Sequence, residues 1–181
     1  QRKLVETKGD DINTVAKAIS YFHDVGDAAS EKETRAHALK NVDKALAAEE
    51  KQFASVGKNS LEALGKARDW VHYAGAGKER AMARAEQRGD TLSAEESRTF
   101  LELALNYYGF AEKKDKQQKL RDKARGLGDR AAAKGETELA AGYYHVAGDN
   151  DKAEALRKRG EQQQAQTEEA RAEAQGREAD A

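Results

Sequence analysis

Apolar residues recur along most of the chain at spacings of three and four positions, the period of an α-helix that buries one face. The first such run places Ile12, Val15, Ile19 and Phe22 on a single face. No stretch alternates apolar and polar residues as a half-buried strand does, so we expect an all-α chain. The predicted helices span about residues 10–25, 29–54, 59–74, 77–88, 93–112, 115–127, 130–147 (with Gly135 as a point where it can break) and 149 onward.

The dipeptide Gly-Asp marks the ends of several predicted helices. Glycine adopts the left-handed conformation that ends a helix, and an aspartate side chain accepts hydrogen bonds from the free amides that begin the next one. We therefore expect Gly26, Gly89 and Gly148 to close helices and the aspartate after each to begin the following helix. The same dipeptide occurs at 9–10 and 128–129. Turns this short join antiparallel neighbours.

The chain also repeats itself. The stretch 18–27, "AISYFHDVGD", shares its tyrosine, histidine, glycine and aspartate with 140–149, "AAGYYHVAGD", and residues 103–121 match residues 139–157 at a shift of 36. A further copy, "ARDWVHYAG", lies at 67–75. Each copy is a predicted helix that ends in an aromatic pair, a tight turn and a second helix. Periods in this range indicate stacked helical hairpins.

These repeats resemble the tetratricopeptide repeat (TPR) family, whose unit is a 34-residue helical hairpin. Tyr144, Gly148 and Ala153 of the last copy fall at the spacing of the family's aromatic residue, turn glycine and small second-helix residue. The resemblance covers about residues 10–160 and implies an α-solenoid of about four antiparallel hairpins in a right-handed superhelix. The alternative is an ordinary bundle of alanine-rich helices that look alike.

Composition supports the helical interpretation. The chain has 181 residues with no proline and no cysteine, is 38% hydrophobic and 36% charged, and has a net charge of −1. Much of the apolar share is alanine, so we expect a thin core. The charge balance does not favour nucleic acid, and without cysteine there are no disulfides or thiolate metal sites. No apolar run is long enough for a membrane span. The sequence begins with Gln1, so we expect a processed chain or a fragment.

The aromatic pairs are predicted to pack between repeats. Adjacent residues on a helix lie about 100° apart, so one ring can face the partner helix and the other the next hairpin. We therefore expect Tyr108→Ala or Tyr144→Ala to lower the free energy of unfolding by about 3–5 kcal/mol. The pairs are Tyr21–Phe22, Trp70–Val71, Tyr107–Tyr108 and Tyr143–Tyr144.

Three of the four histidines follow these pairs at one equivalent position, where the third copy has glycine. Because the three belong to separate repeats about 10 Å apart, and no carboxylate recurs beside them, we expect no metal site. A cap on the helix end is the simpler interpretation. The TPR resemblance implies instead that first helices line a groove, but the pattern with which some members clamp a peptide carboxylate is missing. The groove residues would be Ser20, His23, Asp69, His72, Asn106, Gly109 and His145.

Charge is unevenly distributed along the chain. Residues 113–134 hold nine Lys or Arg against three Asp, and Lys116, Lys119 and Lys123 share one helix face. Such a face is most often simply solvated, but it could bind an acidic partner, an anionic polymer or lipid head groups. Residues 161–181 hold six acids against two bases and form either a continuing helix or a disordered tail. We therefore divide the chain into an extension at 1–9, a repeat domain at 10–160 and an acidic tail at 161–181.

The sequence carries no motif of an enzyme: no nucleophile elbow, no phosphate-binding glycine loop and no paired-histidine metal motif. We expect no cofactor and a non-enzymatic protein that binds another protein or peptide through the groove of its repeats. A structural helical bundle in a secreted or envelope-associated assembly is the first alternative, and binding of an anionic polymer or lipid surface through 113–134 is the second. The sequence indicates neither the oligomeric state nor the compartment, and a periplasmic, secreted or cytoplasmic location all fit.

Overall fold

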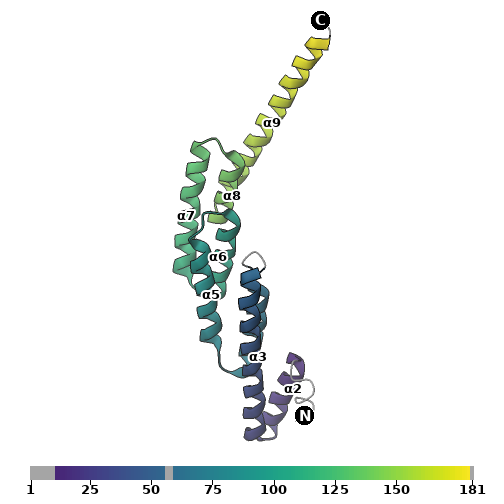
Figure 1. Ribbon diagram of the computed structural model, residues 1–181, viewed down its shortest axis with the longest axis vertical. Helices are drawn as coiled ribbons and strands as arrows, with labels where there is room; N and C mark the ends of the chain where they lie inside the picture. The colour runs from purple at the N-terminus through teal and green to yellow at the C-terminus, as the bar shows by residue number, and fades with distance from the viewer. Residues whose placement is uncertain (1–10, 56–58, 180–181) are drawn as a thin grey trace. The chain divides into compact units, whose positions relative to one another are not determined.

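The computed structural model describes residues 11–55 and 59–179, with side chains as far as residue 171. The described residues form helices joined by short turns and contain no strand, which confirms the all-α prediction (Figure 1). The extension predicted at 1–9 and the Gly-Asp at 9–10 lie outside the described residues. The helices are α2 (Ile12–Asp24), α3 (Ala28–Ser55), α4 (Leu61–Ala74), α5 (Lys78–Ser93), α6 (Arg98–Phe110), α7 (Lys114–Ala133), α8 (Thr137–Ala147) and α9 (Asn150–Ala179).

The chain divides into two compact units. The first consists of Gln1–Gly89 with Asn106–Glu112, and the second of Asp90–Leu105 with Lys113–Ala181. Helices α5 and α6 therefore each contribute residues to both units. The packing of each unit is described separately below.

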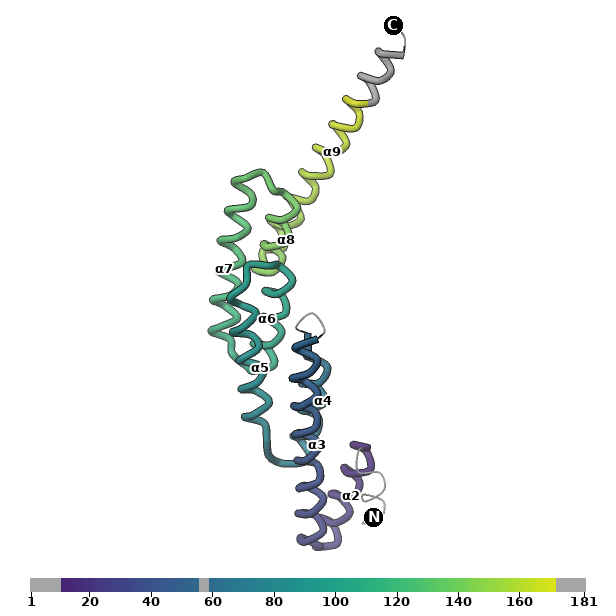
Figure 2. The backbone as a smooth tube through the Cα atoms, viewed as in Figure 1, coloured from purple at the N-terminus to yellow at the C-terminus, as the bar shows by residue number. Residues whose placement is uncertain are grey.

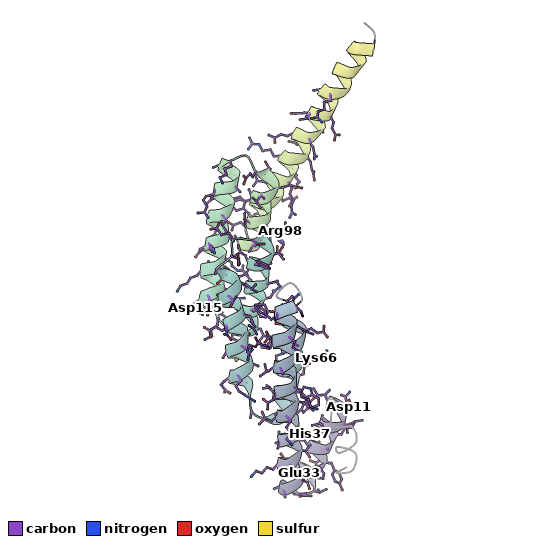
Figure 3. The ribbon with its side chains drawn as sticks, viewed as in Figure 1. Asp11, Glu33, His37, Lys66, Arg98 and Asp115 are labelled. Atoms are coloured by element: carbon purple, nitrogen blue, oxygen red, sulfur yellow. The ribbon has the colours of Figure 1, made fainter. Side chains whose placement is uncertain are left out.

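The first unit is built around the pairing of α3 with α4, which lie side by side (Figure 2). Helix α2 packs against the N-terminal half of α3 and the C-terminal half of α4. Asp11, at the start of α2 (Figure 3), accepts hydrogen bonds from the amides of Asn13 and Thr14 at 3.3 and 3.2 Å, which satisfies two free donors of the first turn. The core residues of this part are buried Val15, Ile19, Ala38, Val42 and Ala74, with Leu39, Leu46, Trp70, Val71 and Tyr73 packed against them.

The second unit is built around α8, which packs against α7 on one side and α9 on the other. Ala140, Ala141, Tyr143, Tyr144, Val146 and Ala147 are all buried. Arg98, at the start of α6 (Figure 3), lies over Gly142, where a Cβ atom would come within 2.7 Å of the Arg98 Cδ. The C-terminal part of α9 extends past α7 and α8 (Figure 1), and residues 161–171 are exposed.

Two of the predicted Gly-Asp turns are confirmed. Gly26 and Gly148 have φ of +73° and +85°, in the left-handed region that favours glycine. Asp27 then begins α3, where its carboxylate accepts a hydrogen bond from the Ser30 amide at 3.1 Å. Gly135, with φ of +77°, separates α7 from α8. The predicted helix 130–147 is therefore interrupted at the glycine named as its possible break point.

The prediction of turns at Gly89–Asp90 and at 128–129 was wrong. Gly89 lies inside α5, which continues to Ser93, and Gly128 lies inside α7, which continues to Ala133. A Cβ atom on Gly89 would meet the Tyr108 ring at 2.6 Å, and one on Gly128 would meet the Tyr144 ring at 3.1 Å. These glycines therefore allow a tyrosine to approach a helix backbone, and they remain in the helical conformation. The helix predicted from 93 begins only at Arg98, because α5 continues to Ser93 and residues 94–97 form the connection between the two helices.

The predicted burial of the aromatic pairs holds for most of their members. Tyr107, Tyr108, Tyr143, Tyr144 and Phe22 are buried. Trp70 and Val71 are partly buried against the core of the first unit, and Tyr21 differs, since it is 49% exposed. Its ring packs edge to face on its neighbour Phe22, at 5.6 Å between ring centroids.

No helix in the described part of the chain combines the length and the apolar character that crossing a bilayer requires.

Candidate functional site

A depression of about 370 Å³ in the first unit brings together three of the predicted groove residues. Ser20 and His23 come from α2, and His72 comes from α4. Each histidine follows the aromatic pair of its own helix, so the matching register puts both on the same side of the two helices. The remaining lining residues are Ala16, Ile19, Arg35 and Tyr73.

The charges at this depression are organised by Glu31 and Arg35 of α3. The Arg35 Nε donates to Glu31 Oε1 at 2.9 Å, and its Nη1 donates to the Tyr73 carbonyl oxygen at 3.0 Å. The hydrogen bond from Arg35 lowers the pKa of the Glu31 carboxyl below its usual range. His23 Nδ1 lies 3.4 Å from Glu31 Oε2, while the His23 side chain is 76% exposed. The guanidinium is therefore held in place, and the imidazole stays accessible to a ligand.

The other predicted groove residues do not line this depression. Asp69 is exposed on α4, and Asn106 and Gly109 are exposed on α6. His145 of the second unit is exposed, and its Nδ1 lies 3.1 Å from Asn150 Oδ1. Thus Ser20, His23 and His72 are the part of the predicted set that the first unit brings to one place.

The predicted basic face on α7 is partly occupied by contacts within the chain. Lys116 Nζ donates to both carboxylate oxygens of Asp90, at 2.7 and 2.9 Å. Lys123 Nζ donates to the carbonyl oxygens of Ser93 and Glu95 at 2.7 and 3.2 Å, and so caps the C-terminal end of α5. Lys119 is exposed.

A second hollow, of about 710 Å³, lies between α3 and α5 in the first unit. Its lining includes Leu46 and Ala83, and Asp43 of the lining is paired with Arg80 at 2.7 Å. Arg84 forms a further ion pair with Glu50. The two acids of the lining are therefore already paired with arginines, and Lys51 adds one further positive charge.

A buried polar cluster in the first unit was missed by the sequence interpretation. The Glu49 side chain is fully buried and accepts hydrogen bonds from Arg88 Nε at 2.8 Å and from Ser60 Oγ at 2.6 Å. The Tyr107 hydroxyl accepts from the Ser60 amide at 2.7 Å and lies 2.9 Å from Ser60 Oγ. Arg88 also stacks over the Phe53 ring, 4.0 Å from its centroid. The sequence did carry a signal for this cluster. Glu49 falls at helical spacing between Leu46 and Phe53, so an acidic residue lies on the apolar face of the helix.

This buried cluster is structural, because its groups satisfy one another and the Glu49 and Ser60 side chains have no contact with solvent. Among the described residues, no group of three or more histidine, cysteine or acidic side chains could hold a metal ion. The accessible depression between α2 and α4 is therefore the better candidate site. Comparison of the chain with family models, curated proteins and solved structures found no match.

Proposed function

We propose that the chain is a non-enzymatic helical-repeat module that holds a peptide segment of another protein in a groove between the first helices of successive hairpins. In this proposal α2–α3, α4–α5, α6–α7 and α8–α9 are four TPR-like hairpins stacked as a right-handed α-solenoid.

The stacking is supported by a contact that recurs with the repeat. The Tyr107 hydroxyl bonds to Ser60, just before α4, and the Tyr143 hydroxyl donates to the Glu96 carbonyl oxygen at 2.8 Å, just before α6. Both contacts span 47 residues, and the second follows the first by the 36-residue shift of the sequence repeat. Two hairpins that meet in the same way are what an α-solenoid requires.

The glycine contacts support the same arrangement. Tyr108 of α6 presses on Gly89 of α5, and Tyr144 of α8 presses on Gly128 of α7. In both cases an aromatic residue of a first helix meets a glycine in the second helix of the hairpin before it. Such close approach between helices accounts for a small-residue core.

The depression between α2 and α4 is the observation that carries the binding function. It lies between the first helices of two successive proposed hairpins, and its lining includes Ala16, Ile19 and Tyr73. The two imidazoles and the fixed Arg35 supply polar groups at its edge. This surface suits a segment that inserts one apolar side chain and offers an acceptor, such as a carboxylate, beside it.

Binding of an anionic polymer through α7 is less well supported, because Lys116 and Lys123 are bonded within the chain. A purely structural role is the remaining alternative, and the following experiment separates it from peptide binding.

A photo-crosslinking amino acid placed at Ser20 or His72 tests the proposal in a lysate of the cells that naturally contain the protein. We expect a discrete adduct from these two positions and none from Lys40, which is exposed on α3 outside the depression. Adding His72→Ala to the Ser20 probe should reduce the adduct without lowering the melting temperature. Equal labelling from all positions, or none, would favour the structural role.

A further inference from the structure

Helix α2 exposes an apolar surface that includes Tyr21 and Val25. Tyr21 is 49% exposed and Val25, the residue that ends the helix, is 56% exposed. Residues four apart lie on the same face of a helix, so the two side chains form one patch. We call it the α2 patch.

The positions equivalent to the α2 patch are buried or partly buried in the later repeats. The sequence repeat aligns Tyr21 with Tyr107 and Tyr143, which are 0% and 8% exposed, and with Trp70, which is partly buried. It aligns Val25 with Ala74, Ala111 and Ala147, which are 9%, 1% and 4% exposed. Among the described residues, the first repeat exposes this surface most, and it does so with Val25, which is larger than the alanine found in the others.

The covering element in the later repeats is known from their contacts. Ser60 and the ring of Phe53 cover Tyr107, and the chain at Glu96 covers Tyr143. Ser60 directly precedes α4 and Glu96 lies two residues before α6, so in each case the cover includes the entry to the preceding first helix. The α2 patch is therefore shaped to receive the start of a first helix.

The last repeat offers such a helix start with an exposed apolar residue beside it. Glu136 precedes α8, and Leu139 in the first turn of α8 is 44% exposed. Exposed charges flank both surfaces: Lys17 and Asp24 beside the α2 patch, and Lys134 and Glu138 beside Leu139. With the exposed Glu136, the Leu139 surface carries two acids and one base, so Lys17 beside the α2 patch can be paired with an acid when the two surfaces meet.

We propose that a second copy of this chain covers the α2 patch with the start of its own α8 around Leu139, so that copies associate head to tail. The inference rests on the repeat organisation in the proposed function and does not require the depression between α2 and α4. The two surfaces are different, so the interface is heterologous and adds copies in an open series.

Sedimentation velocity over a wide range of protein concentrations tests this association. We expect the wild type to form species larger than a dimer as concentration rises. Tyr21→Glu and Leu139→Glu should each weaken self-association by more than about tenfold. Ala48→Glu, which puts the same acid at an exposed alanine of α3, should leave it unchanged. Circular dichroism melts check that the variants remain folded, as expected for exposed positions.

Mixing the variants gives the sharper test. Tyr21→Glu keeps the Leu139 surface and Leu139→Glu keeps the α2 patch, so an equimolar mixture should form a heterodimer and nothing larger. A wild type that stays monomeric, single variants that still self-associate, or a mixture that stays monomeric would each overturn the proposal. If self-association fails but Ser20 still gives a crosslinked adduct, the proposed peptide binding is unaffected. If self-association is observed but Ser20 gives no adduct, only the peptide binding is contradicted.

Discussion

The Glu49 carboxylate is fully buried, and its bonds to Arg88 and Ser60 compensate for its loss of hydration. Removal of one member of a buried ion pair leaves the other charge without compensation. We expect Glu49→Gln to lower the free energy of unfolding by about 3–5 kcal/mol, measured by urea denaturation.

The matched control for Glu49 is its neighbour Glu50. The Glu50 side chain is 59% exposed although it also pairs with Arg84 and Arg88. Because exposed pairs contribute little, Glu50→Gln should cost about 1 kcal/mol or less. If both variants lowered the free energy of unfolding by the same amount, the burial of Glu49 would not be the cause of its larger expected effect.

Tyr144 gives a prediction for alkaline pH. Its hydroxyl donates to Asp129 Oδ1 at 2.5 Å, and this bond, together with burial, raises the pKa of Tyr144 from 10.0 to about 12. The unfolded chain therefore loses this proton at lower pH than the folded chain does. The resulting stabilisation is complete below pH 10 and is lost as pH rises towards about 12. Urea denaturation across this interval should show a smaller decline for Tyr144→Phe than for the wild type.

A difference in pKa between the folded and the unfolded chain also predicts a change of stability at acidic pH, in this case for Asp149. The hydrogen bond from Arg125, 2.7 Å from Arg125 Nε to Asp149 Oδ2, lowers the pKa of Asp149 below 3.8. The stabilisation is present above the unfolded-state pKa and is lost as pH falls below it through the folded-state value. We expect Asp149→Asn to reduce the acid sensitivity of the second unit, followed by circular dichroism between neutral pH and strong acid. An unchanged acid transition would contradict the role of this pair.

At the scale of helices, two glycines inside α5 and α7 have opposite surroundings. A Cβ on Gly89 would lie 2.6 Å from the buried Tyr108 ring, whereas a Cβ on Gly126 would meet nothing within 4 Å. Alanine is a better helix former than glycine by about 1 kcal/mol. Gly126→Ala should therefore stabilise the protein by up to about 1 kcal/mol, while Gly89→Ala should destabilise it by about 1–3 kcal/mol through overpacking. Thermal melts of both variants check the difference in sign.

Helix α9 shows what an element without tertiary packing is expected to do. Its side chains from 161 to 171 are exposed, so its helical structure there depends on local interactions such as the ion pair of Glu154 with Lys158 just before them, at 2.7 Å. Isolated helices are marginal in water. We expect amide hydrogens of 161–171 to exchange much faster than those of 139–147, measured by hydrogen exchange with mass spectrometry. Comparable protection of the two segments would mean that something covers α9.

At the scale of the whole molecule, the proposed array of hairpins predicts that stability is local. In a repeat array each hairpin contacts only its neighbours, so a lesion weakens the nearest repeats most. Glu49→Gln should therefore accelerate hydrogen exchange in α3 and α4 more than in α8. A uniform increase throughout the chain would indicate a single cooperative unit in place of an array.

The candidate site was predictable only in part, for a physical reason. The register of His23 and His72 after their aromatic pairs is written in the sequence, and it was enough to place these two imidazoles beside Ser20. Arg35 could not be assigned in the same way, because it comes from the long helix between α2 and α4. Its position depends on the carbonyl of Tyr73, which only the packing of α3 against α4 brings within reach.

The sequence alone determined that the chain is helical, that its aromatic residues recur in register and that Gly26 and Gly148 end helices. The tertiary structure decided which Gly-Asp pairs are turns. A Cβ on Gly26 would meet nothing within 4 Å, so only its local conformation matters, whereas Gly89 is pressed by a ring 19 positions along the chain. At Gly26 the helix ends because of the local backbone conformation. At Gly89 the same Gly-Asp dipeptide stays helical, and glycine is needed there because the Tyr108 ring leaves no room for a Cβ atom.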